Sequence, residues 1–277
     1  MCEIFCFNSK APKEINKALN QFYNHSDKHP HGWGLANIKS DRYIIDKEPV
    51  KASESEKLKK ILSKPIIGKM VFAHIRLATI GKLTPSNCHP FVKKDNTGRC
   101  WMLMHNGTVF NYPGLEKYQE IQKGSTDSER ILLFIIDKVN EFEKSKNALL
   151  TTEERFNLIT DIISDLSREN KINIMICDGE LTYVHTNLKD SLHSLRTDNG
   201  LILTSCPLND DKNWKTVDIN KIYGLKDGKI ILKSKNHGNE FIFTEKHEEI
   251  IREAIKSLDK ELYDKLMEEY DKNAMSF

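Results

Sequence analysis

The chain begins with an apolar segment of strand type, and this segment constrains the fold more than any other. Residues 2–7 read Cys-Glu-Ile-Phe-Cys-Phe, with one charged side chain among apolar ones. Chain ends are usually frayed and exposed, whereas an apolar run of this kind forms a strand buried within a sheet. We therefore expect the core to begin at once, with Cys2 at the start of a buried strand.

Short strands and helices follow without a repeating strand–helix–strand rhythm, which predicts an α+β fold with antiparallel sheets. Further strands are expected after residue 34 and over residues 43–48, 70–79, 101–105, 172–177, 181–185, 201–205, 221–225 and 229–232. Helices are expected over residues 12–24, 53–62, 151–167 and 245–270, and one opens at 124–129 and ends before a polar connector over 142–150.

Cys2 combines two reactive groups once the initiator methionine is removed, and a side chain as small as cysteine favours that removal. A thiol of pKa about 8.5 then lies beside an α-amino group of pKa about 7.7–8.0, so the nucleophile carries its own base. The alternative is a cysteine that follows the methionine by chance and packs as a small hydrophobic residue. Residue 2 alone does not decide between the two.

Arg76 lies at the end of the apolar strand 70–79, where a guanidinium needs a partner. It is either a structural ion-pair residue or a receptor for a carboxylate, which its planar fork suits. Asn106-Gly107 follows the strand 101–105. That dipeptide is usually a hairpin turn, but it also offers donors to an oxyanion. Asp127 suits the first turn of its helix, and that role is compatible with binding a ligand.

Composition excludes several classes of function. Lys and Arg total 42 and Asp and Glu 40, giving a net charge of +2, so neither nucleic acid nor an anionic membrane is an expected partner. No apolar run reaches the ~20 residues of a membrane span. No signal peptide is recognisable, so a cytoplasmic location is expected.

Neither a metal nor a cofactor is expected. The cysteines number six, and none forms a Cys-x-x-Cys pair. The Cys88-His89 pair with Cys100 and His105 contains zinc-binding residue types, but the spacing matches no standard ligand pattern.

Several motifs occur in one order along the chain, and together they resemble a known family. They are Cys2, His-Gly-Trp-Gly at 31–34, Ala-His-Ile-Arg-Leu-Ala-Thr at 73–79, Asn-Cys-His-Pro-Phe at 87–91, His-Asn-Gly at 105–107 and Ser-Thr-Asp-Ser-Glu at 125–129. This set resembles the class II glutamine amidotransferases, most closely the stand-alone bacterial members. The resemblance continues weakly to about residue 235.

The resemblance implies an N-terminal nucleophile fold, a four-layer αββα sandwich of two antiparallel sheets between helices. It implies a single domain over residues 1–277, with 245–272 as a C-terminal covering helix. The family roles transfer residue by residue: Cys2 is the nucleophile, and Asn106 and Gly107 hold the oxyanion. Arg76 and Asp127 bind the substrate α-carboxylate and α-ammonium groups, and Thr79 belongs to a mobile glutamine loop. Trp33 and His105 are expected beside the substrate in supporting positions.

The implied reaction is hydrolysis of the side-chain amide of glutamine or a γ-glutamyl amide, with release of ammonia or an amine. The sandwich leaves no room for a synthase domain, so we expect either a separate ammonia-accepting synthase subunit as a partner or a simple hydrolase of a γ-glutamyl amide. The main alternative is a non-catalytic binding or regulatory module, which retention of Met1 favours. A cysteine protease using Cys88 or Cys206 with a histidine is a weaker alternative.

Overall fold

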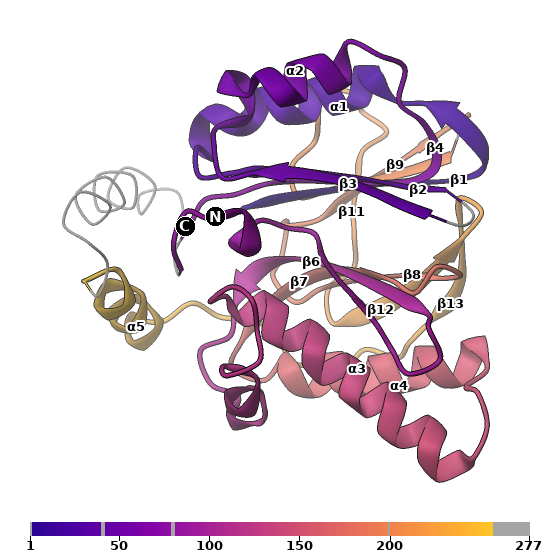
Figure 1. The fold of residues 1–277 in the computed structure, drawn as a ribbon, viewed down its shortest axis with the longest axis vertical. Coiled ribbons are helices and arrows are strands. Elements are labelled where there is room, and N and C mark those ends of the chain that lie inside the picture. The colour runs from indigo at the N-terminus through magenta and orange to yellow at the C-terminus, as the bar shows by residue number, and fades with distance from the viewer. Residues whose placement is uncertain (1, 40–41, 79–80, 199, 257–277) are drawn as a thin grey trace.

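Two antiparallel sheets stack face to face, and helices cover both outer faces (Figure 1). The computed structural model describes residues 2–39, 42–78, 81–198 and 200–256. Helices α1 (Asn16–Tyr23) and α2 (Glu56–Leu62) lie on one side, and α3 (Asp127–Lys146) and α4 (Thr152–Leu166) lie on the other. This arrangement is the predicted four-layer αββα sandwich.

The first sheet has the order β11-β9-β10-β1-β4-β2-β3 within the described residues. Its strands are β1 (Glu3–Glu14), β2 (Trp33–Lys39), β3 (Arg42–Glu48), β4 (Ile67–Ile75), β9 (His193–Thr197), β10 (Gly200–Thr204) and β11 (Lys215–Thr216). The second sheet has the order β13-β12-β8-β7-β6-β5. Its strands are β5 (Phe91–Lys94), β6 (Cys100–Thr108), β7 (Lys171–Cys177), β8 (Thr182–Thr186), β12 (Lys221–Lys226) and β13 (Lys229–Lys233).

Strand β1 lies in the interior of the first sheet, as its apolar sequence predicts. It pairs with β4 on one side and with β10 on the other, so its backbone is hydrogen-bonded along both edges. Successive side chains point to opposite faces of a strand. Ile4 and Cys6 accordingly enter the core between the sheets, whereas Phe5 and Phe7 enter the core beneath α1 and α2. Full burial of a large apolar side chain stabilises the fold by roughly 1.5–3 kcal/mol.

The second sheet shows the same division. Met102, Met104 and Met175 contribute to the core between the sheets. Residues of the opposite parity, including Leu103 and Ile174, join the core beneath α3 and α4. The parity of a residue in β6 or β7 therefore tells which layer its side chain enters.

Several element predictions were wrong in detail. Pro12 was expected in the first turn of a helix, but it lies in the long strand β1, and α1 starts at Asn16. Asn106-Gly107 was expected to be a turn, but β6 continues through both residues to Thr108. The polar segment after Phe142 was expected to be a connector, but α3 runs on to Lys146. Polarity marked that segment as solvent-exposed, which an outer helix turn satisfies as well as a loop does.

The last described helix, α5 (Glu245–Lys256), stands apart from the other helices in Figure 1. His247 at its start lies against the Phe110 ring, with 4.4 Å between ring centroids, and also contacts Phe241. The predicted continuation to residue 272 lies outside the described residues. The covering role and the single domain over residues 1–277 stay predictions.

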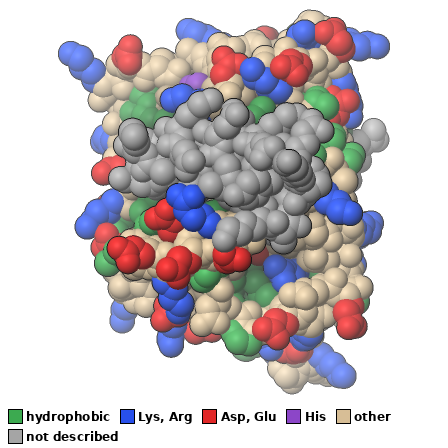
Figure 2. All heavy atoms as spheres, turned by 90° about the vertical axis from the view of Figure 1, so that its left-hand side faces the viewer, with side chains coloured by type: hydrophobic (Ala, Val, Ile, Leu, Met, Phe, Trp, Pro, Cys, Tyr) green, Lys and Arg blue, Asp and Glu red, His purple; other side chains and the backbone are tan. Residues whose placement is uncertain are grey.

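Basic and acidic side chains are interspersed on the described part of the face in Figure 2, in agreement with the small net charge. Among the described residues, none of the helices combines the length and the apolar composition that a membrane crossing requires.

A buried ion-pair network ties α4 to the turn between β7 and β8. Arg155 donates from Nε to Asp178 at 2.7 Å and from Nη2 to Glu180 at 2.7 Å. The Asp178 carboxylate also accepts the Tyr183 hydroxyl at 2.8 Å. The Arg155 and Asp178 side chains are 2% and 0% exposed.

Replacing Asp178 by alanine should therefore lower the free energy of unfolding by about 3–5 kcal/mol, because it leaves a buried guanidinium without its main partner. Urea unfolding measures this loss. The matched control is Glu141→Gln, which removes the exposed ion pair with Lys138 and should cost less than about 1 kcal/mol. Equal losses in the two variants would contradict the assignment.

The fold should also lose stability in acid through His185. Burial lowers the pKa of His185 to about 3, whereas an unfolded histidine titrates near 6.5. Between these pH values the unfolded chain binds the proton and the folded chain does not. Stability therefore falls as the pH drops below about 6.5, by at most about 1.4 kcal/mol per pH unit. His185→Gln should make that slope shallower.

His25 is a control of opposite sign for the same pH series. Its hydrogen bond to Glu3 raises its pKa, so its stabilising contribution is present in acid and is lost as the pH rises through the folded pKa. His25→Gln should thus make acid unfolding steeper. Unfolding curves that respond alike to the two substitutions would show that burial of His185 does not set the acid sensitivity.

Candidate active site

Cys2 lies at the end of the space between the two sheets, just before β1 begins. Its thiol donates to the Leu77 carbonyl at a sulfur–oxygen distance of 3.4 Å. Burial raises the pKa of the Cys2 thiol, and the positive charges of Arg76 and Lys171 oppose that rise. A thiolate is easier to form beside fixed positive charge, so Arg76 and Lys171 offset part of the effect of burial, which still dominates.

Arg76 follows β4 and is 3% exposed. Its Nη1 and Nη2 donate to the carbonyls of Lys82 at 3.2 Å and Gly81 at 3.3 Å. Burial lowers the pKa of Arg76, whereas the charges of Cys2 and Asp127 raise it. The guanidinium is therefore fixed by backbone carbonyls, with the thiol and a carboxylate close enough to influence it.

Asp127 opens α3 and is 7% exposed. Its Oδ2 accepts the Val109 N–H at 2.8 Å, and its Oδ1 accepts the Ser128 N–H at 2.7 Å. The helix N-cap is the preceding residue, Thr126, whose hydroxyl accepts the Glu129 N–H. Because Thr126 caps the helix, the Asp127 carboxylate is held at the junction between β6 and α3 by separate bonds.

Asn106 faces the first sheet, in keeping with its even parity in β6. Its Nδ2 donates to Ser205 Oγ at 3.2 Å, and Ser205 Oγ accepts the Ile4 N–H at 3.1 Å. Ser205 therefore connects Asn106 to the strand that carries Cys2. Asn106 Oδ1 is buried and has no hydrogen-bond partner among the described residues. An unpaired buried oxygen is costly, so this end of the Asn106 amide is available to bind a ligand.

Gly107 lies where two strands approach closely. A Cβ atom at this position would come within 1.9 Å of the Lys171 carbonyl oxygen. No side chain fits there without moving the backbone of β7, so glycine is required at this position for the β6–β7 pairing.

The other predicted site residues take different places. His105 points to the helix side, where its Nδ1 is 3.1 Å from Ser128 Oγ and its Nε2 is 3.1 Å from the Lys171 carbonyl. Trp33 is fully buried in the core beneath α1 and α2, on the face of the first sheet opposite Cys2. Thr79 lies outside the described residues. The structure thus brings together Cys2, Arg76, Asn106 and Asp127, and sets His105 and Trp33 behind the sheets.

Lys171 is a neighbour of Cys2 that the sequence analysis missed. It is 4% exposed and begins β7. The sequence analysis started this strand at Ile172, which left Lys171 among presumed loop residues. A lysine directly before six apolar or amide residues was the available signal, since strand boundaries are uncertain by one or two residues.

A stacked pair of buried imidazoles lies behind Arg76. The rings of His74 and His89 are 4.1 Å apart at 22°, and burial lowers the pKa of both. Both rings are therefore neutral at physiological pH, so they add bulk rather than charge beside the site.

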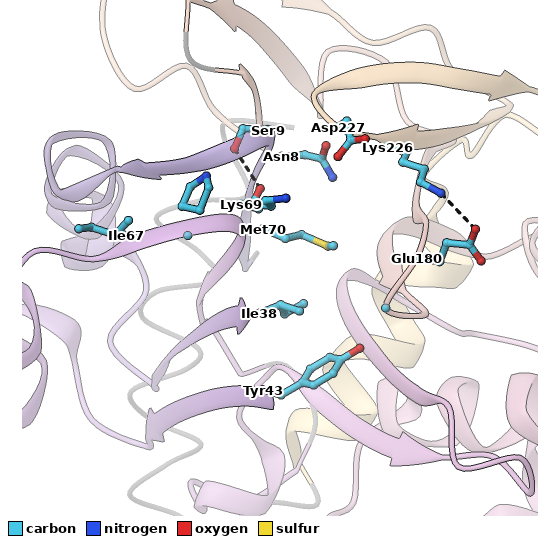
Figure 3. Close-up of a pocket in the computed structure, with 13 residues that line it drawn as sticks. Asn8, Ser9, Ile38, Tyr43, Ile67, Lys69, Met70, Glu180, Lys226 and Asp227 are labelled. Atoms are coloured by element: carbon cyan, nitrogen blue, oxygen red, sulfur yellow. Dashed lines mark hydrogen bonds and ion pairs between the residues drawn. The ribbon is translucent and has the colours of Figure 1, made fainter. Parts of the chain in front are cut away.

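A hollow lies between the sheets, away from Cys2 (Figure 3). It has a cavity volume of about 790 Å³. Met70 and Tyr43 reach from the first sheet toward the ion pair of Lys226 with Glu180. Asn8 of β1 lines it, six residues along the strand from Cys2 and so roughly 20 Å away. None of the predicted site residues that the structure describes lines this hollow. Within the described ranges, no group of three or more His, Cys, Asp or Glu side chains could hold a metal ion.

The model of the family described as "Glutamine amidotransferases class-II" matches residues 1–199. The chain belongs to the class II glutamine amidotransferases. Cys2, Arg76, Asn106 and Asp127 all fall within the matched part of this amidotransferase.

Relatives and solved structures agree with that membership. A protein of Haemophilus influenzae named "Putative glutamine amidotransferase" is 26% identical over 258 residues, which cover 83% of this chain and 86% of the relative. The "Gamma-glutamyl-hercynylcysteine sulfoxide hydrolase" of Mycolicibacterium smegmatis is 26% identical over 165 residues, covering 59% and 63%. The crystal structure of a predicted glutamine amidotransferase from Pseudomonas aeruginosa superimposes with a TM-score of 0.61 at 19% identity, covering 83% of this chain and all of that one. At that identity the superposition shows a shared fold.

Proposed function

We propose that this amidotransferase hydrolyses the side-chain amide of glutamine or a related γ-glutamyl amide through a thioester on Cys2. The observation that carries the proposal is the position of the Cys2 thiol beside the fixed guanidinium of Arg76, with the Asp127 carboxylate close to that guanidinium. A glutamyl group has a carboxylate, an ammonium and a reactive amide. One cation, one anion and one nucleophile in one site match those three groups.

The reaction begins after removal of Met1. The α-amino group of Cys2 takes the thiol proton, and the sulfur forms a bond to the amide carbon. The C–N bond then breaks, and the proton passes to the leaving nitrogen, which departs as ammonia or an amine. Water hydrolyses the γ-glutamyl thioester, which releases a free γ-carboxylate and restores the thiol. Electrons move in pairs throughout, so no redox partner is required.

Asn106 and Gly107 are the proposed oxyanion site. In its present orientation the Asn106 amide leaves Oδ1 unpaired. A half-turn of that amide lets Ser205 donate its hydroxyl proton to Oδ1, since Ser205 Oγ already accepts from Ile4. The same half-turn directs Nδ2 to the space that Oδ1 now faces, where it can donate to a developing oxyanion.

The identity of the amide remains part of the proposal. The mycobacterial relative is named as a hydrolase of a γ-glutamyl compound, which supports an amide larger than glutamine among the substrates. We also propose that the enzyme works in the cytoplasm. Where ammonia is the product, a separate synthase subunit would accept it.

Protein whose mass confirms loss of Met1 should release ammonia from glutamine or amine from γ-glutamyl amides. Cys2→Ala should abolish turnover, because it removes the atom that forms the thioester. Cys100→Ala is the matched control and should retain turnover, since Cys100 is at the far end of β6 from Asn106. Asparagine, which is shorter by one methylene, and N-acetylglutamine, which lacks the ammonium, should be poor substrates. Absence of turnover on every γ-glutamyl amide with a verified free Cys2 would refute the proposal.

Ser205→Ala tests the proposed orientation of Asn106. Loss of its hydroxyl removes one hydrogen bond that orients the amide, so kcat should fall by about tenfold, the equivalent of roughly 1.4 kcal/mol. KM should change little, because Ser205 contacts Asn106 and β1 rather than the amino-acid head of the substrate. Steady-state kinetics with the best substrate provides the measurement. An unchanged kcat would contradict the proposal that Ser205 orients Asn106 for oxyanion binding.

A further inference from the structure

Strand register brings Lys171 to the Cys2 end of the space between the sheets. Cys6 of β1 and Cys177 of β7 both enter the core between the sheets, close enough that Cys177 contributes to the raised pKa of the Cys6 thiol. Four residues back along β1 from Cys6 is Cys2. Six residues back along β7 from Cys177 is Lys171. Both steps are even, so both side chains point into the space between the sheets.

Pairing within the second sheet agrees with this placement. Lys171 pairs with Thr108 of β6, and Asn173 pairs with Asn106. Lys171 therefore lies one even step beyond the level of Asn106, on the same face of the sheet. Asn106 is connected to Ile4 through Ser205, which fixes the height of Cys2 opposite this part of β7.

Several described groups with titratable or charged side chains bear on the site of Lys171. Cys2 faces it from the first sheet, and the two groups shift each other's pKa. Arg76, at the end of β4, acts on the same thiol and is influenced by Asp127 of α3. His105 of β6 is on the other face of the sheet, where its Nε2 donates to the Lys171 carbonyl and its Nδ1 is hydrogen-bonded to the Ser128 hydroxyl.

We propose that the Lys171 ammonium is a second counter-ion of the Cys2 thiolate, facing it from the second sheet while Arg76 acts on it from the end of β4. This role for Lys171 rests on the proposed function in one respect, because it takes Cys2 as the nucleophile. Membership of the family does not depend on it. When the thiol proton moves to the amine of Cys2, a thiolate and an α-ammonium form together, and a protonated Lys171 Nζ adds to the positive charge of that ammonium and of Arg76 in stabilising the thiolate. No bond to Lys171 forms or breaks.

The electrostatics of the pair support this role. Burial lowers the pKa of Lys171 to about 7, and the charge of Cys2 opposes that shift. A thiolate therefore helps Lys171 to keep its proton, and a protonated Lys171 helps the thiolate to form. Two such groups titrate as a pair. Near neutral pH the pair is consequently sensitive to the loss of either partner.

Lys171→Met tests the proposal, because methionine keeps an unbranched apolar stem and removes the charge. We expect the pH midpoint of Cys2 alkylation by iodoacetamide to rise by about one unit, and the rate at pH 7 to fall by about tenfold. Peptide mapping assigns the label to residue 2. Lys171→Gln, a polar neutral variant, should give the same shift and replaces Lys171→Met if that chain does not fold.

Two controls separate this role from a structural one. Lys93→Met removes an exposed charge on β5 and should leave the alkylation midpoint unchanged. Thermal unfolding of Lys171→Met shows that the variant is folded before its alkylation is compared with that of the parent protein. An unshifted midpoint in the neutral variants would overturn the proposal, and so would a shift of equal size in Lys93→Met.

The alkylation assay needs no substrate turnover, so the two proposals fail separately. Protein that hydrolyses γ-glutamyl amides but alkylates identically with and without Lys171 would overturn the counter-ion alone. Protein that hydrolyses none of them but shows the shifted midpoint would overturn the hydrolase and leave the counter-ion in place.

Discussion

The pairing of β1 along both of its edges is the constraint on which the rest of the molecule depends. Because β4 and β10 hydrogen-bond to it from either side, the start of the chain is held in the middle of a sheet rather than at its edge. That anchorage fixes the level of Cys2 against the second sheet. Ser205 then connects β1 to Asn106 across the gap, so the two sheets are in register at the end where the proposed chemistry takes place.

Burial and charge act in opposite directions at this end of the sandwich. Burial raises the pKa of the Cys2 thiol and lowers those of Arg76 and Lys171, so each charged form is less favourable than it would be in water. Each group offsets part of that cost for its neighbours. The Asp127 carboxylate, held by the backbone of Val109 and Ser128, balances part of the positive charge. A zwitterionic ligand would add charges of both signs without disturbing that balance.

Local patterns in the sequence predicted an α+β fold with antiparallel sheets, and the resemblance to a known family implied the sandwich and most of the residues that the structure gathers around Cys2. An arginine ending an apolar strand was visible from residue order alone, because such a guanidinium requires a partner. The failures have physical causes. Pro12 can begin a helix or lie in a strand, and only pairing with β4 decides between the two. Asn-Gly is a frequent turn, yet Gly107 lies in a strand that pairs with β7. Glycine is needed there because β7 leaves no room for a Cβ. Lys171 depends on register between distant strands, which one sequence does not encode locally.

The central position of β1 has a consequence for the order of events during synthesis. Its partner β4 ends at Ile75, but β10 begins at Gly200. At roughly 5–20 residues per second, the ribosome needs on the order of 10–40 seconds to make the second partner after it has made β1. One edge of β1 stays unpaired throughout that interval, and the nascent end remains open to a peptidase. The proposed removal of the leading methionine therefore has its natural window before the last strands close around Cys2.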